Sequence, residues 1–262
     1  MEGLAARVRP LTLAGERTVP VPAAFHELVP GGGLRRGSTV SVRGSLALAL
    51  ALVAVASTAG SWVAAVGLPD LGMVAAAEAG IALERFALVP AVAPRKWATV
   101  VAALLDAVDV VLAQPPEAGP AGLTAGQARR LAARARERGS VLVALGHGWS
   151  APADLRLALV ASRWKGLGQG HGRLAARMVQ VELAGRGAAA RERRAWLWLP
   201  GPGAARGGPY AERIDLLSRA ASRCDAAPAR SLLELAAEPE PEPEPQGEGA
   251  AAPPATRLRA SG

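Results

Sequence analysis

The chain has almost no cysteine and almost no lysine. Cys224 is the only cysteine among 262 residues, which excludes a disulfide within the chain and fits a reducing compartment such as the cytoplasm. Arginine supplies 28 of the 30 basic residues, and Lys96 and Lys165 are the exceptions. With 22 acidic residues the net charge is +8, which permits an acidic partner such as nucleic acid without identifying it.

Secretory and membrane-spanning signals are also missing. No charged segment precedes an apolar one at the start, so no secretory signal is expected. Residues 46–68 carry no charge and are long enough to cross a bilayer. However, Ser57, Thr58, Gly60 and Ser61 interrupt this stretch where a turn would fall. We therefore interpret it as a buried helix followed by a buried strand, and expect no membrane association.

A phosphate-binding loop is the third missing feature. The segment GSTVSVRG, residues 37–44, is typical of a buried strand that is entered and left through glycine. A nucleotide-binding core would next supply more glycines, a lysine and a hydroxyl. Here Gly44 and Ser45 lead directly into alternating leucine and alanine. With no loop to surround phosphates and no lysine to balance their charge, a conventional nucleotide site is not expected.

Strand-like and helix-like segments alternate as far as residue 146. Thr124 and Gln127 stand at the spacing of a capping box, and Gly139 ends the helix that they begin. Alternating units of this length predict a parallel sheet covered by helices, so the expected fold class is α/β. Strands are predicted at 61–67, 85–89, 108–114 and 140–146, and helices at 73–79, 94–107 and 124–139.

The pattern changes from about Arg173. The alternating segments RMVQVELAG and RRAWLWLPG, joined by a charged turn at 186–194, predict a closing antiparallel hairpin. Glycine and proline then dominate 201–210, and two short helical stretches follow. The final acidic, proline-rich stretch has too little apolar material to fold. The expected organisation is an N-terminal segment (1–30), a core (31–200), a linker with short helices (201–237) and a disordered tail (238–262).

Few residues suggest a reactive centre. The three histidines are scattered without metal-ligand spacing, and no ligand neighbours Cys224, so no metal site is expected. His147 follows a predicted strand at the place where α/β folds put their sites. A glycine-flanked histidine in an exposed turn is the alternative.

The segment RWKGLGQGHGR, residues 163–173, is the best candidate for nucleic-acid contact. Arg163, Lys165 and Arg173 stand beside Trp164 and four glycines. We expect a flexible loop whose cations contact phosphates and whose tryptophan stacks on a base, giving weak binding to DNA. Burial of Trp164 in the core is the alternative.

Several segments together resemble a known family. LVPGGGLRRGSTVSVRG, residues 28–44, resembles the start of the RecA recombinase core, and the likeness continues in order through 61–72, 77–91 and 107–114 to the closing hairpin, about 170 residues. With its altered loop the chain looks most like the ImuA family, of the actinobacterial ImuA-prime type. These are RecA-like accessory proteins of the translesion mutasome.

The resemblance implies a degenerate nucleotide site. Gly44 and Ser45 occupy the place of the phosphate loop, and Asp70, next to a proline, is near the place of a second-strand acid. Gln114 stands where the family has a metal-holding aspartate, and its neutral amide is a poorer magnesium ligand. The expectation is a pseudo-ATPase without a cofactor. The alternative is a DNA-stimulated nucleotidase with an unconventional site.

The resemblance also implies partners. ImuB, an inactive relative of Y-family polymerases, an error-prone C-family polymerase and RecA are expected, in the cytoplasm and on the nucleoid after damage. Residues 11–30 are typical of a segment that docks one subunit on the next, giving a homo-oligomer. The C-terminal stretches have apolar residues that would contact either a partner or the core. These are Ile214, Leu216, Leu217, Leu232 and Leu233. A RecA-fold cell-division inhibitor with a tubulin-like partner is a further alternative.

Overall fold

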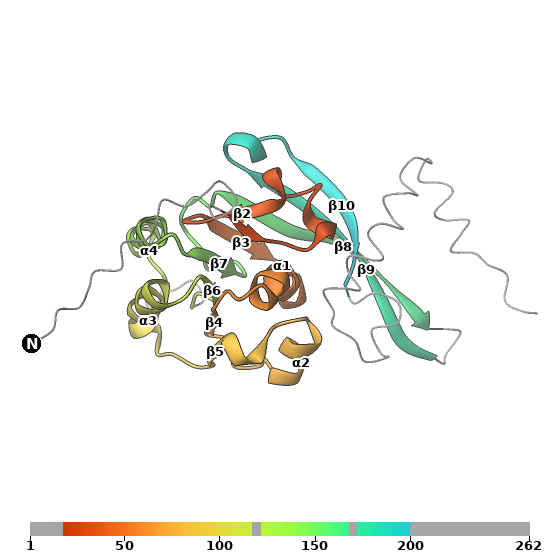
Figure 1. The fold of residues 1–262 in the computed structure, drawn as a ribbon, viewed down its shortest axis with the longest axis horizontal. Helices are drawn as coiled ribbons and strands as arrows, with labels where there is room; N and C mark the ends of the chain where they lie inside the picture. Colours follow the sequence, from red (N-terminus) through yellow and green to blue (C-terminus); the bar gives the residue numbers. More distant parts are fainter. Residues whose placement is uncertain (1–17, 117–121, 168–171, 200–262) are drawn as a thin grey trace, which may run out of the picture. The chain divides into compact units, whose positions relative to one another are not determined.

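The computed structural model describes residues 18–116, 122–167 and 172–199. Its main sheet contains β3 (Thr39–Arg43), β4 (Val63–Val66), β5 (Phe86–Val89), β6 (Val110–Ala113), β7 (Val141–Leu145), β8 (Leu155–Leu167), β9 (Gly172–Gly185) and β10 (Arg193–Trp198). The strand order is β10-β9-β8-β3-β7-β6-β4-β5 (Figure 1). Neighbours from β8 to β5 pair in parallel, whereas β9 and β10 continue the sheet antiparallel. The α/β class, with a mostly parallel sheet and a closing hairpin, is confirmed.

Helices cover both faces of the parallel strands. They are α1 (Leu46–Thr58), α2 (Met73–Glu78), α3 (Pro94–Ala107) and α4 (Ala125–Arg138). In β7, Val141 and Val143 belong to the hydrophobic cluster around α1, whereas Leu142 and Ala144 belong to the cluster beneath α3 and α4. This alternation follows from the two-residue period of a strand. Uninterrupted apolar strands are therefore required here, because both faces are buried.

Helix α1 is apolar all round because protein surrounds it on all sides. Nine of its 13 residues are buried, as expected for a helix without a polar face. Ser57 is buried too, and its hydroxyl oxygen accepts a hydrogen bond from the backbone N–H of Ala82 at 2.9 Å. The expected turn follows, with Gly60 at φ +101°. Within the described ranges no helix is both long and apolar enough to cross a membrane.

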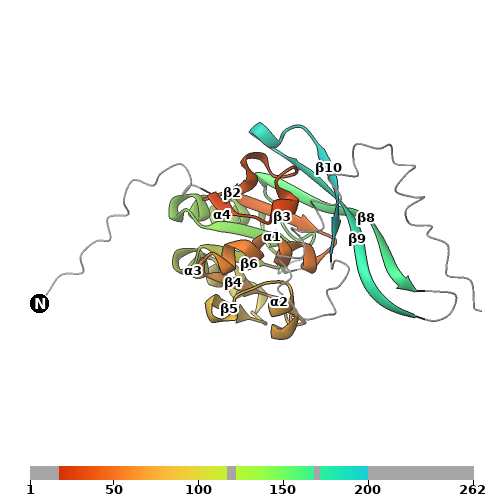
Figure 2. The same cartoon turned by 45° about the vertical axis from the view of Figure 1, so that its right-hand side comes forward.

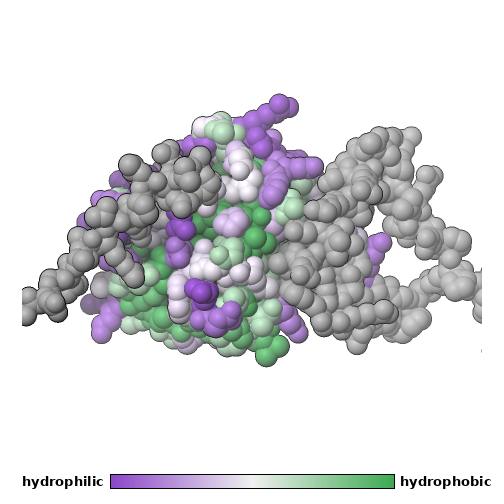
Figure 3. All heavy atoms as spheres, viewed as in Figure 1, coloured by the Kyte–Doolittle hydropathy of each residue, from purple (hydrophilic) through white to green (hydrophobic). Residues whose placement is uncertain are grey.

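Helix α2 contributes little to this core. Of its six residues only Ala76 is buried, and Val74 is 72% exposed. Apolar surface is visible over this helix at the lower edge of the view in Figure 3. The α1 face of the sheet is therefore filled mainly by α1 itself and by the N-terminal segment.

The N-terminal segment packs on its own chain. Strand β1 (Thr18–Pro20) pairs antiparallel with β2 (Gly33–Arg35) in a separate two-stranded sheet, which the sequence pattern did not indicate. Val19, Phe25 and Leu28 are buried in the cluster around α1. Residues 18–29 thus complete this core. Subunit docking stays a prediction, and its residues 11–17 lie outside the described part of the chain.

The predicted capping of α4 is confirmed. The Thr124 hydroxyl accepts from the Gln127 N–H at 3.2 Å, and the Gln127 side chain accepts from the Thr124 N–H at 2.9 Å. Gly139 ends the helix in the left-handed conformation at φ +70°. These contacts satisfy backbone groups that a helix leaves without partners at its ends.

The prediction of a flexible loop at 163–173 was wrong for most of that stretch. Residues 163–167 belong to β8 and residues 172–173 to β9, whereas 168–171 lie outside the described residues. The two strands form a long hairpin that extends beyond the rest of the sheet (Figure 2). A register shift between Leu159 and Ala161 breaks the alternation by which β8 could have been found. The predicted hairpin of β9 and β10 is confirmed.

One surface ion-pair cluster leads to a pH-dependent prediction. Arg134 and Arg138 both donate hydrogen bonds to the Asp106 carboxylate. The hydrogen bond from Arg134 lowers the pKa of Asp106 below its ordinary value of 3.8; desolvation opposes this shift, and the charges of Arg134 and Arg138 add to it. The ionised carboxylate therefore stabilises the fold above pH about 4, and this contribution is lost as the pH falls through the lowered pKa.

Asp106→Asn should therefore lower the urea midpoint of unfolding at pH 7 by a small amount, with a gap to the parent that closes below pH 4. Urea titrations followed by circular dichroism from pH 7 to pH 3 measure this. Glu84→Gln is the control, because Glu84 has no ion pair with any described residue. If the difference in urea midpoint between Asp106→Asn and the parent stayed constant down to pH 3, the ionised Asp106 carboxylate would not be its cause.

Candidate functional site at the carboxyl edge of the sheet

The carboxyl ends of the parallel strands lie side by side at one edge of the sheet. The backbone N–H of Gly146, after β7, donates to the carbonyl of Val42 in β3 at 3.0 Å. The N–H of Gln114, after β6, donates to the carbonyl of Val66 in β4 at the same distance. The structure thus brings Gly44, His147 and Gln114 to one edge, where α/β folds bind their ligands.

The turn between β3 and α1 is only two residues long. Arg43 ends the strand and Leu46 begins the helix, so Gly44 and Ser45 form the whole connection. Gly44 adopts φ +84°, and a side chain built there would lie 3.3 Å from the Cβ of Leu159 in β8. The space beside the turn is therefore occupied by the neighbouring strand.

The start of α1 is capped by the protein itself. The Ser45 hydroxyl oxygen accepts from the backbone N–H of Leu48 at 3.2 Å. A phosphate at a helix N-terminus uses such free backbone N–H groups together with the helix dipole. One of these donors is already paired here, and a two-residue turn supplies few others.

The nearest cation in the sequence does not serve this turn. Val40 and Val42 point into the cluster around α1, so strand alternation directs Arg43 to the opposite face of the sheet. Arg43 is not among the site residues predicted from the sequence. In the sequence Arg43 stands next to the turn. Its position in the strand, however, puts its charge on the side of the sheet that α3 and α4 cover.

Gln114 is exposed directly after β6. Gly67, at the end of β4, lies so close that a side chain there would come within 2.7 Å of the Gln114 carbonyl oxygen and 3.3 Å of Trp97 Nε1. Asp70 is exposed in the following turn. In the described part of the chain, no three His, Cys, Asp or Glu side chains come together as a metal ion would require.

His147 lies in an exposed turn after Gly146. A catalytic histidine is oriented by a hydrogen bond to a neighbouring group, and no such bond from His147 to another described residue is found. Trp149, two residues later, is buried, and no described residue accepts a hydrogen bond from its indole N–H. His147 therefore occupies an exposed turn, as the alternative interpretation of the sequence predicted.

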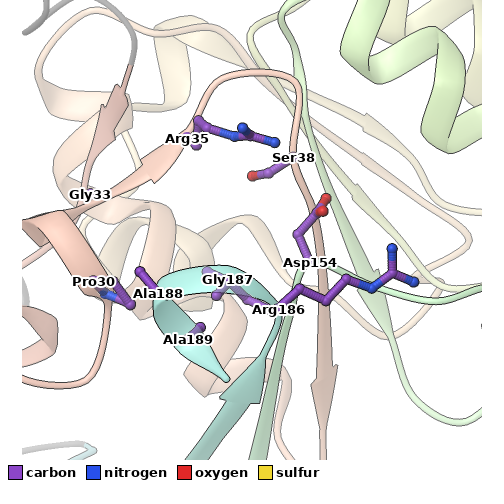
Figure 4. A pocket seen from close by; sticks show the side chains of 10 residues that line it. Pro30, Gly33, Arg35, Ser38, Asp154, Arg186, Gly187, Ala188 and Ala189 are labelled. Carbon is purple, nitrogen blue, oxygen red and sulfur yellow. The ribbon is translucent and has the colours of Figure 1, made fainter. Parts of the chain in front are cut away.

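A cavity of about 340 Å³ lies at the opposite edge of the sheet, where β3 and β8 begin (Figure 4). Ser38 is 2% exposed, and its hydroxyl has no hydrogen-bond partner in the described part of the chain. The Asp154 carboxylate accepts a hydrogen bond from the Thr39 N–H at 2.9 Å. Arg35 and Arg186 complete its polar lining. Because this cavity opens at the amino ends of the strands, it is not a remnant of a nucleotide site.

The other predicted site residues lie elsewhere. Arg163 and Lys165 are exposed on β8, and Arg173 is in β9 with a side chain outside the described part of the structure. The predicted partner-binding residues lie outside the described residues altogether: Ile214, Leu216, Leu217, Leu232 and Leu233. Because β8 pairs in parallel with β3 only as far as Ala158, Arg163 and Lys165 lie on the part of β8 that continues beyond the carboxyl end of β3.

Comparison with known proteins shows the family to which the chain belongs. The family described as MT3502 N-terminal domain matches residues 27–151. The uncharacterized protein Rv3395c of Mycobacterium tuberculosis is 34% identical over 143 residues, which make up 54% of this chain and 68% of that protein. The chain belongs to this family. The match runs from β2 through β7 and includes Gly44, Gln114 and His147, whereas β8, β9 and β10 lie beyond it.

Proposed function

We propose that the protein is a non-catalytic RecA-like adaptor of the ImuA type. It would act in damage-induced translesion synthesis by recruiting ImuB and an error-prone C-family polymerase. The resemblance of residues 28–44 and the segments after them supports the family. The observation that carries the absence of catalysis is the two-residue turn between β3 and α1.

The strand and helix on either side of that turn are arranged as at a ligand-binding edge. A buried central strand leads to a buried helix at the edge where ligands bind. Phosphate binding needs several convergent N–H groups and a cation at this place. Leu159 packs against Gly44, Ser45 uses the Leu48 N–H, and Arg43 lies on the other face. A domain without these phosphate-binding groups is better suited to recruiting partners than to hydrolysing ATP.

Purified full-length protein should therefore bind no ATP in the micromolar range and hydrolyse none, whether or not single-stranded DNA is present. Calorimetry with magnesium-ATP and a phosphate-release assay measure the two properties. Gln114→Ala is the internal control, because it should change neither result. Micromolar affinity, or turnover that Gln114→Ala removes, would favour the DNA-stimulated nucleotidase and contradict the pseudo-ATPase.

Recruitment is tested by purification from cells treated with a DNA-damaging agent. The tagged protein should copurify with ImuB and the C-family polymerase, and its deletion should reduce damage-induced mutagenesis. Copurification of a tubulin-like protein without ImuB would instead support a cell-division inhibitor. The partners thus distinguish the two binding functions, which the fold alone does not.

A further inference from the structure

Among the described residues, no helix covers one face of the sheet end formed by β8, β9 and β10. The hydrophobic cluster beneath α3 and α4 includes residues of β4, β6 and β7 but, among the described residues, none of β8, β9 or β10. On the opposite face, Val179 and Leu197 are buried in the cluster around α1. Strand alternation therefore turns Met178, Trp196 and Trp198 toward the uncovered side.

Two cations of β8 reach across β9 to tryptophans of β10 on this side. The guanidinium of Arg163 lies 5.7 Å from the ring centroid of Trp196, and the Lys165 ammonium lies 5.5 Å from that of Trp198. Neither cation forms an ion pair with another described residue. We call these four residues the cation–tryptophan face.

The hairpin that carries this face is strongly positive. From residue 155 to residue 181 the sequence contains no acid and five basic residues. Arg194 shares the uncovered side of β10, but Glu182 and Glu192 bind its guanidinium at 2.9 and 2.8 Å. The charges of Arg163 and Lys165 are therefore available to a ligand, whereas that of Arg194 is neutralised within the protein.

We infer that the cation–tryptophan face binds single-stranded DNA. The bases would stack on Trp196 and Trp198, and Arg163 and Lys165 would move from the rings to the phosphates. Stacking of a base on an aromatic ring is stronger than the contact of an exposed cation with that ring, so the exchange is favourable. The inference rests on these four residues and is independent of the proposed role with ImuB.

The spacing of the face favours single strands over duplexes. Residues two apart on a strand are separated by about 6.8 Å, so the two cation–tryptophan pairs repeat at that distance. Each strand of a DNA duplex advances about 3.4 Å per nucleotide, and its bases are already stacked on each other. An extended single strand can place successive unstacked bases at the wider spacing.

Trp164 is not part of this face, although it stands between Arg163 and Lys165 in the sequence. Alternation places it on the other side of β8, where the guanidinium of Arg177 lies 5.4 Å from its ring. Trp164 is 46% exposed, so it is not a core residue, as the alternative interpretation would have required. Trp164 therefore provides a matched control for the loss of one exposed tryptophan.

The experiment measures binding of the full-length protein to a fluorescent oligo-dT and to a duplex of equal length, by anisotropy over a range of salt. Arg163→Ala with Lys165→Ala should weaken binding and reduce the salt slope by about 1.4, since each phosphate contact on a single strand contributes about 0.7. Trp198→Leu should weaken binding about fivefold or more with the slope unchanged. Trp164→Leu should change neither property, because Trp164 lies on the other side of β8.

Circular dichroism melts of each variant show whether the fold is kept, and Trp198→Phe, which retains a ring for stacking, should recover most of the lost affinity. The inference is overturned if the double alanine variant binds like the parent. It is also overturned if duplex and single strand bind equally, or if Trp164→Leu weakens binding as much as Trp198→Leu. None of these results depends on ImuB, so a failure of this inference would not contradict the proposed adaptor function.

Discussion

A chain that ends at Pro209 should stay folded and lose its association with ImuB. The two hydrophobic clusters of the described core are built from residues between Val19 and Leu199, so the core keeps them after the truncation. The removed part contains two predicted helices, and the first has Ile214 and Leu217 on one side. Helices this short are marginal in isolation, so they need a surface to dock on.

The expected results are no ImuB in a pull-down with the truncated chain, damage-induced mutagenesis reduced to the level of a deletion, and an unchanged melting temperature. Leu216→Asp with Leu217→Asp in the full chain should have nearly the same effect, because two charges would be placed in an apolar contact. Arg219→Glu is the matched control. It changes the net charge by the same two units without altering a leucine.

Two outcomes would contradict this prediction in different ways. ImuB recovered in full with the truncated chain would rule out the C-terminal segment as the contact. A lower melting temperature of the truncated chain would show instead that these helices dock on their own core. The site of ImuB binding would then have to be sought on residues 1–209.

Trp97→Ala should cause a large loss of stability, about 3–5 kcal/mol. Trp97 is 2% exposed and lies in α3 within the cluster beneath α3 and α4. Its removal leaves a cavity between helix and sheet that Val101 and Leu105, on the same face of the helix, are too short to fill. Because domains are stable by only about 5–15 kcal/mol, this single change could remove a large share of the total.

Urea unfolding followed by circular dichroism measures the loss, with Trp97→Phe as the control. The indole N–H of Trp97 has no hydrogen-bond partner among the described residues, so phenylalanine loses no hydrogen bond seen there and keeps most of the ring volume. Its destabilisation should be much smaller than that of alanine. Equal losses for the two variants would mean that the indole N–H has a partner after all, such as a buried water.

The sequence by itself determined the elements that follow from local chemistry. Pro94 at the start of α3, the Thr124 capping box and Gly139 at the end of α4 all mark boundaries that the structure confirms. The uncharged stretch 46–68 was correctly divided into α1 and β4 because Ser57 to Ser61 interrupt it. The short connection of Gly44 and Ser45 between strand and helix was also visible from the sequence, because helix-forming leucine and alanine follow at once.

Only the tertiary structure decided which distant residues meet. The strand β8 was missed because a register shift after Leu159 breaks its alternation, and because Gly166 and the three glycines that soon follow it are typical of a loop. Trp196 and Trp198 were assigned to the closing hairpin, but no local pattern shows that they lie beneath Arg163 and Lys165. That pairing depends on strand order and register across three strands, which arise from packing against α1 and not from the segment itself.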